Sequence, residues 1–503
     1  MIIILLLAGV KLLIPLLTHS DFQFQRDEFL YMAMADHLSW GYLEVPPFIA
    51  VISRVAGMFF GDSLFAMRFL PAFSGAVTLV LTGLIAREMG GGRFALILAG
   101  VSYLFSLVYL RMNLLLQPVT FDCLFFVLGT YLFIRILKTA EAKYWILLGI
   151  VVGFGLLNKY TMLLFGFGVA TGLLFTSYRR MYLTRWPYIS AGIAFLIWLP
   201  NLIWQYQHNW PFFEHMKVLA ETQLSNMNPV MFLLAQLLMN FFSAPIWLAG
   251  LYSLFFGQLS KKFRPVGWIY LSMLLLLLLL SGKVYYLGAA YPMLLAAGSA
   301  AVEGFIRKHS IVWLKPVVFG VVVIGNLALV PVGIPVFSIQ AMIDYFKFGT
   351  KYLGIESALR WESGKLHELP QDFADMLGWE SLTSATAQVY NQLPDSTRQH
   401  YAIYAANYGE AGAIYYYGKK YNLPVPISNS GSFWLWGYRE VTGEYLITVG
   451  SDRQDVEYYY RNVSSGTKFL YPHARESGIE ILKANGLKIT IEELWEIMKK
   501  YRW

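Results

Sequence analysis

Apolar runs of about 20 residues recur along the first two thirds of this chain, and they constrain its fold more than any other feature. A run of that length crosses the hydrocarbon core of a bilayer as one helix. Only 14% of the residues are charged, whereas a soluble globular domain carries about 25%. The chain therefore lacks the polar residues to cover a water-facing surface, and the sequence predicts an α-helical polytopic membrane protein.

The hydropathy pattern predicts about eleven spans, and at most about thirteen. The candidate spans are 1–17, 64–86, 94–111, 118–138, 143–157, 160–177, 187–205, 230–256, 266–281, 284–304 and 311–332. The first run has no basic segment before it and no small-residue cleavage site after it. We therefore expect it to remain as a helix rather than to be removed as a signal peptide.

Lys and Arg residues concentrate in alternate loops, and this bias predicts which loops face the cytoplasm. One set of loops carries 14 of them and the opposite set six. With the richer set inside, the first long loop (18–63), the loop at 206–229 and the C-terminal tail lie outside. The protein is expected in the cell (inner) membrane, with these parts on the extracytoplasmic side.

The tail beyond residue 340 has a different composition, because the apolar runs end and charged residues become frequent. HYAIYAANYG predicts a strand and turn, EAGAIYYYGKKYN a helix, PVPIS and EYLITVG two strands, and DVEYYYRNV a helix. Alternating strands and helices are typical of an α/β domain. We therefore expect a membrane domain over 1–335 and a soluble α/β domain over 340–503. YGEAGA is interpreted as a glycine-containing turn, not as a nucleotide-binding loop.

The first outside loop gathers charged side chains directly after a span. These are Arg26, Asp27, Glu28, Asp36, His37 and Glu44. The segment from Glu28 predicts an amphipathic helix on the membrane surface. Asp27 and Glu28 lie at its N-terminus, where the helix dipole stabilises negative charge. One interpretation makes them helix-start residues alone, and the other makes them functional. Pro46-Pro47 then precedes a short apolar helix over 48–60.

Three further charged residues lie within or beside later spans. Asp122 occupies the first turns of the span 118–138, and a carboxylate inside a membrane is costly enough to be a functional candidate. Its alternative role is an ion pair with Arg111. Lys159 and Lys283 lie at the outer ends of spans, where they are either anchors that extend to the interface or ligands for a phosphate.

The loop at 206–229 and its flanks are rich in aromatic residues and histidine. It offers Trp204, Tyr206, His208, Trp210, Glu214 and His215. The two histidines and Glu214 match no strong metal-binding spacing, so contacts of the aromatic rings with lipid or sugar are the favoured interpretation. A divalent metal stays open. The single cysteine, Cys123, excludes an internal disulfide, and no basic stripe indicates nucleic acid.

These segments resemble a known family. RDEFLYMAMADHLSWGYLEVPPF and FGDSLFAMRFLPAFSG are similar to the first-loop region of bacterial glycosyltransferase family 39 relatives. Those relatives include protein O-mannosyltransferases and lipid A aminoarabinose transferases, which share the type-C membrane glycosyltransferase fold. The resemblance continues through QPVTFDCLFF, GLLNKYT and SGKVYYLGAAYP. It aligns the family's Asp-Glu pair with Asp27-Glu28, its second acid with Asp122, and its acid before Pro-Pro with Glu44.

Two positions depart from the aminoarabinose transferases. Leu30 stands where they have Arg, and Val45 stands where they have Lys before Pro-Pro. The phosphate contacts of those residues must come from elsewhere, with Lys159 and Lys283 as candidates. The departures argue against aminoarabinose transfer itself.

The resemblance implies transfer of a sugar from a polyprenyl-phosphate carrier to an acceptor hydroxyl at the outer face, with inversion. Asp27 would be the general base, with Glu28 and Asp122 shaping its field. The expected substrate-binding residues are Arg26, Tyr31, Glu44, Lys159, His208, Lys283 and Tyr286. The acceptor is a lipid, a glycan or a protein. A transporter or flippase of a lipid-linked sugar, and a non-catalytic scaffold, are the alternatives.

Overall fold

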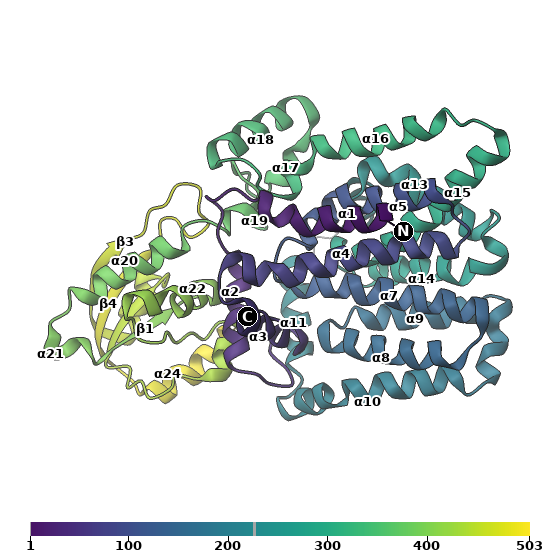
Figure 1. Cartoon of the computed structure of the whole chain (residues 1–503). Coiled ribbons are helices and arrows are strands. Elements are labelled where there is room, and N and C mark those ends of the chain that lie inside the picture. Colours follow the sequence, from purple (N-terminus) through teal and green to yellow (C-terminus); the bar gives the residue numbers. More distant parts are fainter. Residues whose placement is uncertain (1, 225–227, 503) are drawn as a thin grey trace. The chain divides into compact units, whose positions relative to one another are not determined.

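The computed structural model describes residues 2–224 and 228–502. The chain divides into two compact units (Figure 1). The first comprises residues 1–18 and 45–336, and the second comprises residues 19–44 and 337–503. Residues 19–44 of the first long loop therefore fold with the C-terminal part of the chain.

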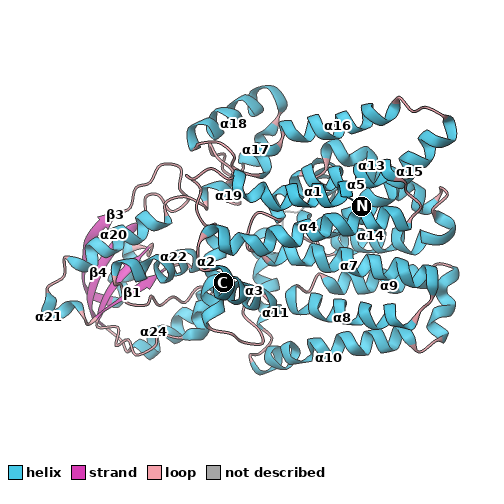
Figure 2. Cartoon of the chain, viewed as in Figure 1, coloured by secondary structure: helices cyan, strands magenta, loops and turns pink. Residues whose placement is uncertain are grey.

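All regular structure in the described part of the first unit is helical (Figure 2). Its N-terminal half contains α1 (Ile2–Leu13), η1 (Ile14–Leu17), α3 (Phe48–Phe60), α4 (Leu64–Glu88), α5 (Arg93–Phe105), α6 (Leu107–Met112), α7 (Pro118–Thr139), α8 (Ala142–Asn158) and α9 (Met162–Leu174). Next come η2 (Ser177–Leu183), α10 (Trp186–Gln207), α11 (Pro211–Leu219), η3 (Ala220–Leu224), α12 (Pro229–Leu238), η4 (Phe241–Ser243) and α13 (Ala244–Phe255). The remainder is α14 (Ser260–Leu279), η5 (Val284–Ala290), α15 (Tyr291–His309), α16 (Leu314–Ala328) and α17 (Val330–Gly333).

Helices lie at each run predicted to cross the membrane, but several are shorter than the run. Within the described residues, five helices are long and apolar enough to span a bilayer, or seven if each bent pair is one span. The bends are 108° after α9 and 82° between α12 and α13. Shorter apolar helices such as α5, α8 and α16 add to these. Several apolar helices are thus confirmed, while the total of about eleven spans stays a prediction.

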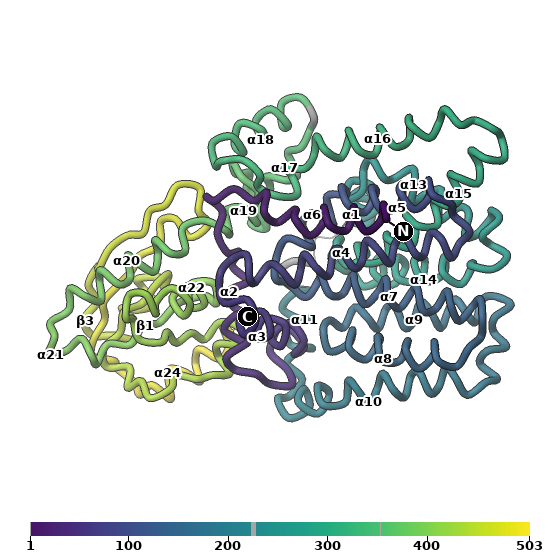
Figure 3. Tube along the Cα trace, in the orientation of Figure 1, coloured from purple at the N-terminus to yellow at the C-terminus, as the bar shows by residue number. Residues whose placement is uncertain are grey.

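In the first unit α4 packs on α7, α7 on α8, and α8 on α10. Figure 3 traces the path of the chain through these helices. Helices α13 and α15 approach most closely through two glycines. A Cβ atom at Gly298 would collide with the backbone oxygen of Ile246, and one at Gly250 with that of Leu294. Small residues at such crossings let helix backbones pack directly against each other, which is typical of membrane helices.

The second unit contains a four-stranded mixed sheet in the order β1-β2-β4-β3. The strands are β1 (Tyr401–Ala405), β2 (Tyr445–Val449), β3 (Tyr460–Lys468) and β4 (Glu480–Leu487). β1 is parallel to β2, with Tyr401 opposite Tyr445, and the other two pairings are antiparallel. Its helices are α2 (Arg26–Asp36), α18 (Ile339–Leu353), η6 (Ile355–Leu359), α19 (Gln371–Ala374), α20 (Trp379–Asn391), α21 (Asp395–Arg398), α22 (Tyr408–Tyr417), η7 (Gly418–Tyr421), η8 (Gly431–Trp436), α23 (Arg453–Tyr459), α24 (Ile491–Met498) and η9 (Lys499–Tyr501).

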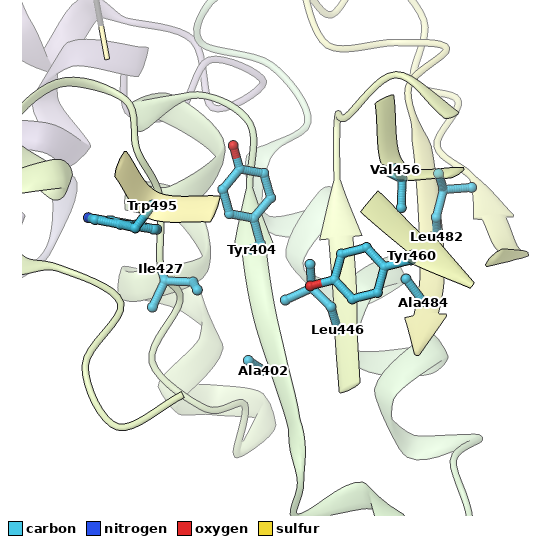
Figure 4. Packing of buried hydrophobic residues seen from close by; sticks show 9 residues of the cluster. All are labelled: Ala402, Tyr404, Ile427, Leu446, Val456, Tyr460, Leu482, Ala484 and Trp495. Carbon is cyan, nitrogen blue, oxygen red and sulfur yellow. The ribbon is translucent and has the colours of Figure 1, made fainter. Parts of the chain in front are cut away.

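One face of the sheet buries an apolar core (Figure 4). Its members are Ala402, Tyr404, Ile427, Leu446, Val456, Tyr460, Leu482, Ala484 and Trp495. Side chains of one strand face reach it at every second position, such as Ala402 and Tyr404 of β1. Helix α24 contributes Trp495 to the cluster, so this C-terminal helix belongs to the same core.

The strands predicted at HYAIYA and EYLITV form, as do the helices predicted after Asn407 and before Tyr460. The segment PVPIS contributes only one bridge, between Ile427 and Tyr404. The segment DVEYYYRNV is helical only to Tyr459, and its remainder starts β3. The prediction of a helix over the whole segment was wrong at that end, because pairing of β3 with β4 outweighs local helix preference.

Helix α2 also differs from its prediction. Its residues from Glu28 to Ala35 are all buried, so the helix has no polar face for water. Phe29 packs edge-on against Trp379 and Tyr417 of the same unit. The prediction of an amphipathic helix lying on a membrane surface is therefore wrong, since α2 is an internal helix of the second unit.

Candidate active site

Asp27 occupies the first turn of α2. The Tyr408 hydroxyl, at the start of α22, donates a hydrogen bond of 2.9 Å to Oδ1 of Asp27. The Asp27 backbone N–H donates to Oε1 of Gln25 at 2.8 Å. Burial raises the pKa of the Asp27 carboxyl above its usual value, while Arg26 and the Tyr408 hydrogen bond oppose this rise. A raised pKa makes the ionised carboxylate a stronger base than an ordinary aspartate.

Arg26 lies beside Asp27 and stacks on the aromatic ring of Tyr408. The distance from its guanidinium carbon to the ring centroid is 4.4 Å, which is within the range of a cation–π contact. Although burial acts against it, attraction by Tyr408 and Asp375 raises the pKa of Arg26 above its ordinary value. Arg26 is therefore a permanent cation next to Asp27.

Glu28 caps its own helix. Its carboxylate accepts a 2.8 Å hydrogen bond from the backbone N–H of Gln25, and the Gln25 side chain accepts one in return, which completes a capping box. This geometry matches the helix-start interpretation of Glu28. Tyr31 follows one turn later and is buried in the same helix.

Glu44 is anchored by η8. Its carboxylate accepts hydrogen bonds from the Ser432 backbone N–H at 2.7 Å and from the Ser432 hydroxyl at 2.5 Å. Burial raises the pKa of Glu44, and the Ser432 hydrogen bonds partly reverse the rise. Repulsion between Glu44 and Asp27 contributes to the same pKa, so the two acids lie within electrostatic range.

A further acid of the second unit has a strongly perturbed pKa. Burial raises the pKa of Asp375 to about 7, although Arg475 and Arg26 attract its ionised form. The carboxylate lies 3.3 Å from the Arg475 guanidinium. The backbone oxygen of Asp375 accepts a hydrogen bond of 3.1 Å from the backbone N–H of Arg26. Asp375 therefore joins α2 to the segment that contains Arg475.

In the first unit, Asp122 lies in α7 with only 2% of its surface exposed. Its Oδ2 accepts a hydrogen bond of 2.8 Å from the Thr161 hydroxyl. Lys159 attracts the same carboxylate. Asp122, Thr161 and Lys159 therefore form one polar group around the junction of α8 and α9.

Lys159 and Lys283 come together at this junction. The two ammonium groups are close enough to repel each other. The Lys159 nitrogen lies 5.0 Å from the centroid of the Tyr285 ring and 4.7 Å from that of Tyr286. Lys283 also interacts electrostatically with His215. Two like charges held together by fixed elements favour an anion between them.

His208 lies at the end of α10, and His215 lies in α11. His208 stacks on Trp204 with 4.0 Å between ring centroids, and its Nδ1 lies 2.8 Å from the Trp204 carbonyl oxygen. Across residues 2–224 and 228–502, no three side chains of His, Cys, Asp or Glu gather in a way that could hold a metal ion. The residues identify no metal site.

Sequence reasoning missed four residues of these sites. They are Tyr408, Ser432, Asp375 and Thr161. Tyr408 belongs to YGEAGA, whose glycines predict a turn, whereas Asn407 before it is a helix-capping residue that indicates the start of α22. Thr161 ends the segment GLLNKYT, in which only Lys159 was predicted to be functional, and Ser432 and Asp375 come from segments with no motif.

Residues 44–204 match the family model described as dolichyl-phosphate-mannose-protein mannosyltransferase. No curated protein sequence matches the chain. In fold the chain is similar to apo ArnT from Cupriavidus metallidurans, with a TM-score of 0.61, 14% identity, and coverage of 95% of this chain and 97% of ArnT. For ArnT bound to undecaprenyl phosphate the TM-score is 0.60 and the identity 13%, with the same coverage of 95% and 97%. Residues 44–204 thus match the model of one family, and the chain as a whole has a fold similar to that of ArnT.

Proposed function

We propose that the protein transfers a glycosyl group from a polyprenyl-phosphate carrier to an acceptor hydroxyl at the outer face of the cell membrane. The observation that carries the proposal is the convergence of Lys159 and Lys283 beside Asp122 in the first unit. A lipid phosphate supplies the anion that such a pair binds. ArnT, which has the same fold, binds undecaprenyl phosphate, and this supports the same class of donor here.

The proposed reaction is one displacement at the anomeric carbon. The acceptor oxygen forms a bond to that carbon as its proton passes to Asp27, and the bond from the carbon to the phosphate oxygen breaks. The electron pair of the broken bond leaves with the polyprenyl phosphate, whose charge Lys159 and Lys283 stabilise. A phosphate is a weakly basic leaving group and needs no acid. Displacement in one step inverts the anomeric centre.

The burial of Asp27 in the second unit supports its role as the base. The Asp27 carboxyl is buried beside Glu44, and the pKa values of both acids are raised because burial disfavours their charged forms. Glu28 is assigned to holding the first turn of α2, since its carboxylate caps that helix. Arg26, Tyr31, Glu44, His208 and Tyr286 stay proposed substrate contacts.

The test is transfer of tritiated sugar from polyprenyl-phosphate mannose, glucose, galactose and aminoarabinose in membranes that contain the protein. Asp27→Asn keeps the size of the side chain and removes the base, so we expect a loss of at least about 100-fold in rate. Asp36→Asn changes the other end of α2 and is the matched control. Loss of transfer in Asp27→Asn alone supports the proposal. Equal transfer by Asp27→Asn and wild type would exclude Asp27 as the base.

The orientation of the protein in the membrane can be tested by cysteine labelling, because Cys123 is the single cysteine and is buried. Introduced cysteines then react without background. Ser464→Cys places a thiol on exposed β3 of the second unit, and Lys261→Cys places one on the exposed start of α14. A membrane-impermeant maleimide added to intact cells should label the first variant and not the second. The reverse pattern would overturn the outer-face assignment.

A further inference from the structure

The N-terminal turn of α22 packs directly on the N-terminal turn of α2. Gly409 and Gly412 make this approach possible, because they carry no side chains. A Cβ atom at Gly409 would lie 2.6 Å from Cγ of Arg26, and one at Gly412 would lie 2.6 Å from Cβ of Phe29. Cβ atoms do not come that close to other atoms, so any larger residue would move the two helices apart.

The start of α22 is fixed by its own capping box. The Asn407 side chain accepts from the backbone N–H groups of Gly409 and Glu410 at 2.9 and 3.0 Å. The Glu410 carboxylate accepts in return from Asn407 at 3.2 Å and from Ala406 at 3.0 Å. These bonds hold the backbone on both sides of Tyr408, so the direction of its side chain is set before any substrate binds.

We propose that Tyr408 is a positioning residue of the sugar-transfer reaction, which orients the Asp27 carboxylate toward the acceptor through its hydroxyl. This inference rests on the proposed function. Two contacts support this role. The Tyr408 hydroxyl donates a 2.9 Å hydrogen bond to Oδ1 of Asp27. The Arg26 guanidinium packs against the Tyr408 ring, 4.4 Å from its centroid, and so holds the ring in place. The segment Tyr-Gly-Glu-x-Gly is then a part of the active site rather than a turn.

Asp27 has charged or titratable neighbours on several elements of the second unit. They are Arg26 on α2, Tyr408 on α22, Glu44 before α3, Glu362 and Asp372 around α19, and Asp375. The acids in this set disfavour the ionised form of Asp27, whereas Arg26 and the Tyr408 hydroxyl favour it. Removing the hydroxyl therefore makes Asp27 easier to protonate.

Tyr408→Phe is the decisive variant, and Tyr415→Phe is its matched control. Tyr415 lies in the same helix α22, and its hydroxyl donates to Asp36 of the same helix α2 at the same distance of 2.9 Å. Each substitution thus removes one hydroxyl-to-carboxylate hydrogen bond between the same two helices. Only the first removes it from the proposed base.

The measurement is the pH dependence of transfer of tritiated sugar from the polyprenyl-phosphate panel, in membranes with each variant. For Tyr408→Phe we expect kcat to fall about tenfold and the acidic limb of the profile to move to higher pH by about one unit, the size expected for a lost hydrogen bond to a charged group. Tyr415→Phe should keep the wild-type kcat and profile. The midpoint of the limb depends on folded molecules only, so a lower yield of one variant does not move it.

Each outcome decides the inference. A limb that moves upward in Tyr408→Phe alone supports it. An active wild type with an unchanged limb in Tyr408→Phe overturns the role of Tyr408 and leaves the proposed function standing. Equal changes in both variants overturn it as well, because the effect would then belong to packing of α22 on α2. A wild type that transfers sugar from none of the donors overturns the proposed function itself, and the role of Tyr408 with it.

Discussion

The Glu44 carboxylate accepts two hydrogen bonds from one residue, Ser432, through its backbone N–H at 2.7 Å and its hydroxyl at 2.5 Å. The Ser432 hydroxyl also accepts from the Leu43 backbone N–H at 3.1 Å. The two residues are far apart in sequence, so this contact closes the second unit between its two chain segments. Its polar groups are buried and mutually satisfied, which makes the loss of either partner costly.

Ser432→Ala should destabilise the second unit by about 1–2 kcal/mol, because a buried acid and a backbone N–H each lose a hydrogen-bond partner. Thermal unfolding of the detergent-solubilised protein, followed by tryptophan fluorescence, measures the change. Ser430→Ala is the control, since the Ser430 hydroxyl makes no hydrogen bond to any residue that the structure describes. Equal melting temperatures for both variants would contradict the assigned role of Ser432.

Gly431→Ala should be more damaging than Ser432→Ala. The φ angle of Gly431 is +57°, in the left-handed region that favours glycine. An added Cβ atom would also collide with Oε1 of Glu44. The same unfolding measurement compares the variant with Gly354→Ala, where φ is +67° and no atom lies near the added Cβ. Gly354→Ala loses stability only through its backbone conformation. If Gly431→Ala lost no more stability than Gly354→Ala, the result would argue against the contact with Glu44.

The raised pKa of Asp375 predicts that the stability of the folded protein depends on pH. Its pKa is about 7 in the folded protein, against 3.8 for a free side chain. Between these values the folded state keeps a proton that the unfolded state releases. This contribution to stability is therefore fully present below about pH 4 and is lost as the pH rises to about 7, at a rate of up to about 1.4 kcal/mol per pH unit.

Asp375→Asn removes this titration, so the stability of wild type relative to the variant should fall as the pH rises from 4 to 7. Melting temperatures of both proteins across this range measure the difference. Arg475→Gln is a useful companion, because it removes a cation 3.3 Å from the carboxylate and should strengthen the dependence. If the stability of wild type relative to Asp375→Asn stayed constant from pH 4 to 7, the Asp375 carboxyl would already be ionised in the folded protein across this range.

The local elements of the fold could be predicted from sequence, because hydropathy and helix-capping residues are local signals. Phe48–Phe60 forms the short apolar helix expected after Pro47, and Pro118–Thr139 follows its predicted span to within one residue. The breaks inside other spans could not be predicted. The 82° bend lies at Met239 and Asn240, between Leu238 of α12 and Phe241, within an otherwise apolar run, and a hydropathy average conceals it.

The site was predictable only where a motif names its residues. Asp27, Glu44 and Asp122 stand out as acids in unusual places, but their partners do not. Tyr408 and Ser432 are ordinary residues in a tail whose fold could be read only coarsely, and they lie hundreds of positions from Asp27 and Glu44. Nothing local could indicate that α2 is internal, because its burial comes from α20 and α22, which are distant in the chain.

Gly298→Ala tests the close crossing of α13 and α15. The added methyl group would collide with the backbone oxygen of Ile246, which cannot move without moving its helix. We expect the free energy of unfolding to fall by several kcal/mol, or the variant to fail to accumulate in the membrane. Overpacking costs about 1–3 kcal/mol, and it costs more where the added atom collides with backbone. Gly304→Ala lies in the same helix with open space around it, and it should be neutral or stabilising by up to about 1 kcal/mol.

Lys159 and Lys283 are proposed to bind the phosphate of the lipid-linked donor, and this role can be tested by substitution. Replacing either by Gln removes one of two cations proposed to bind the donor phosphate, and the KM for the lipid-linked donor should rise by about tenfold or more, the scale of one charge-assisted hydrogen bond. Lys143→Gln is the control, because Lys143 is exposed and pairs with Glu141 at 2.6 Å. Binding of undecaprenyl phosphate to the purified variants gives a second readout, without turnover. Unchanged KM and unchanged lipid binding in both variants would mean that the two lysines are interface anchors, and the phosphate would then have to be bound by other residues.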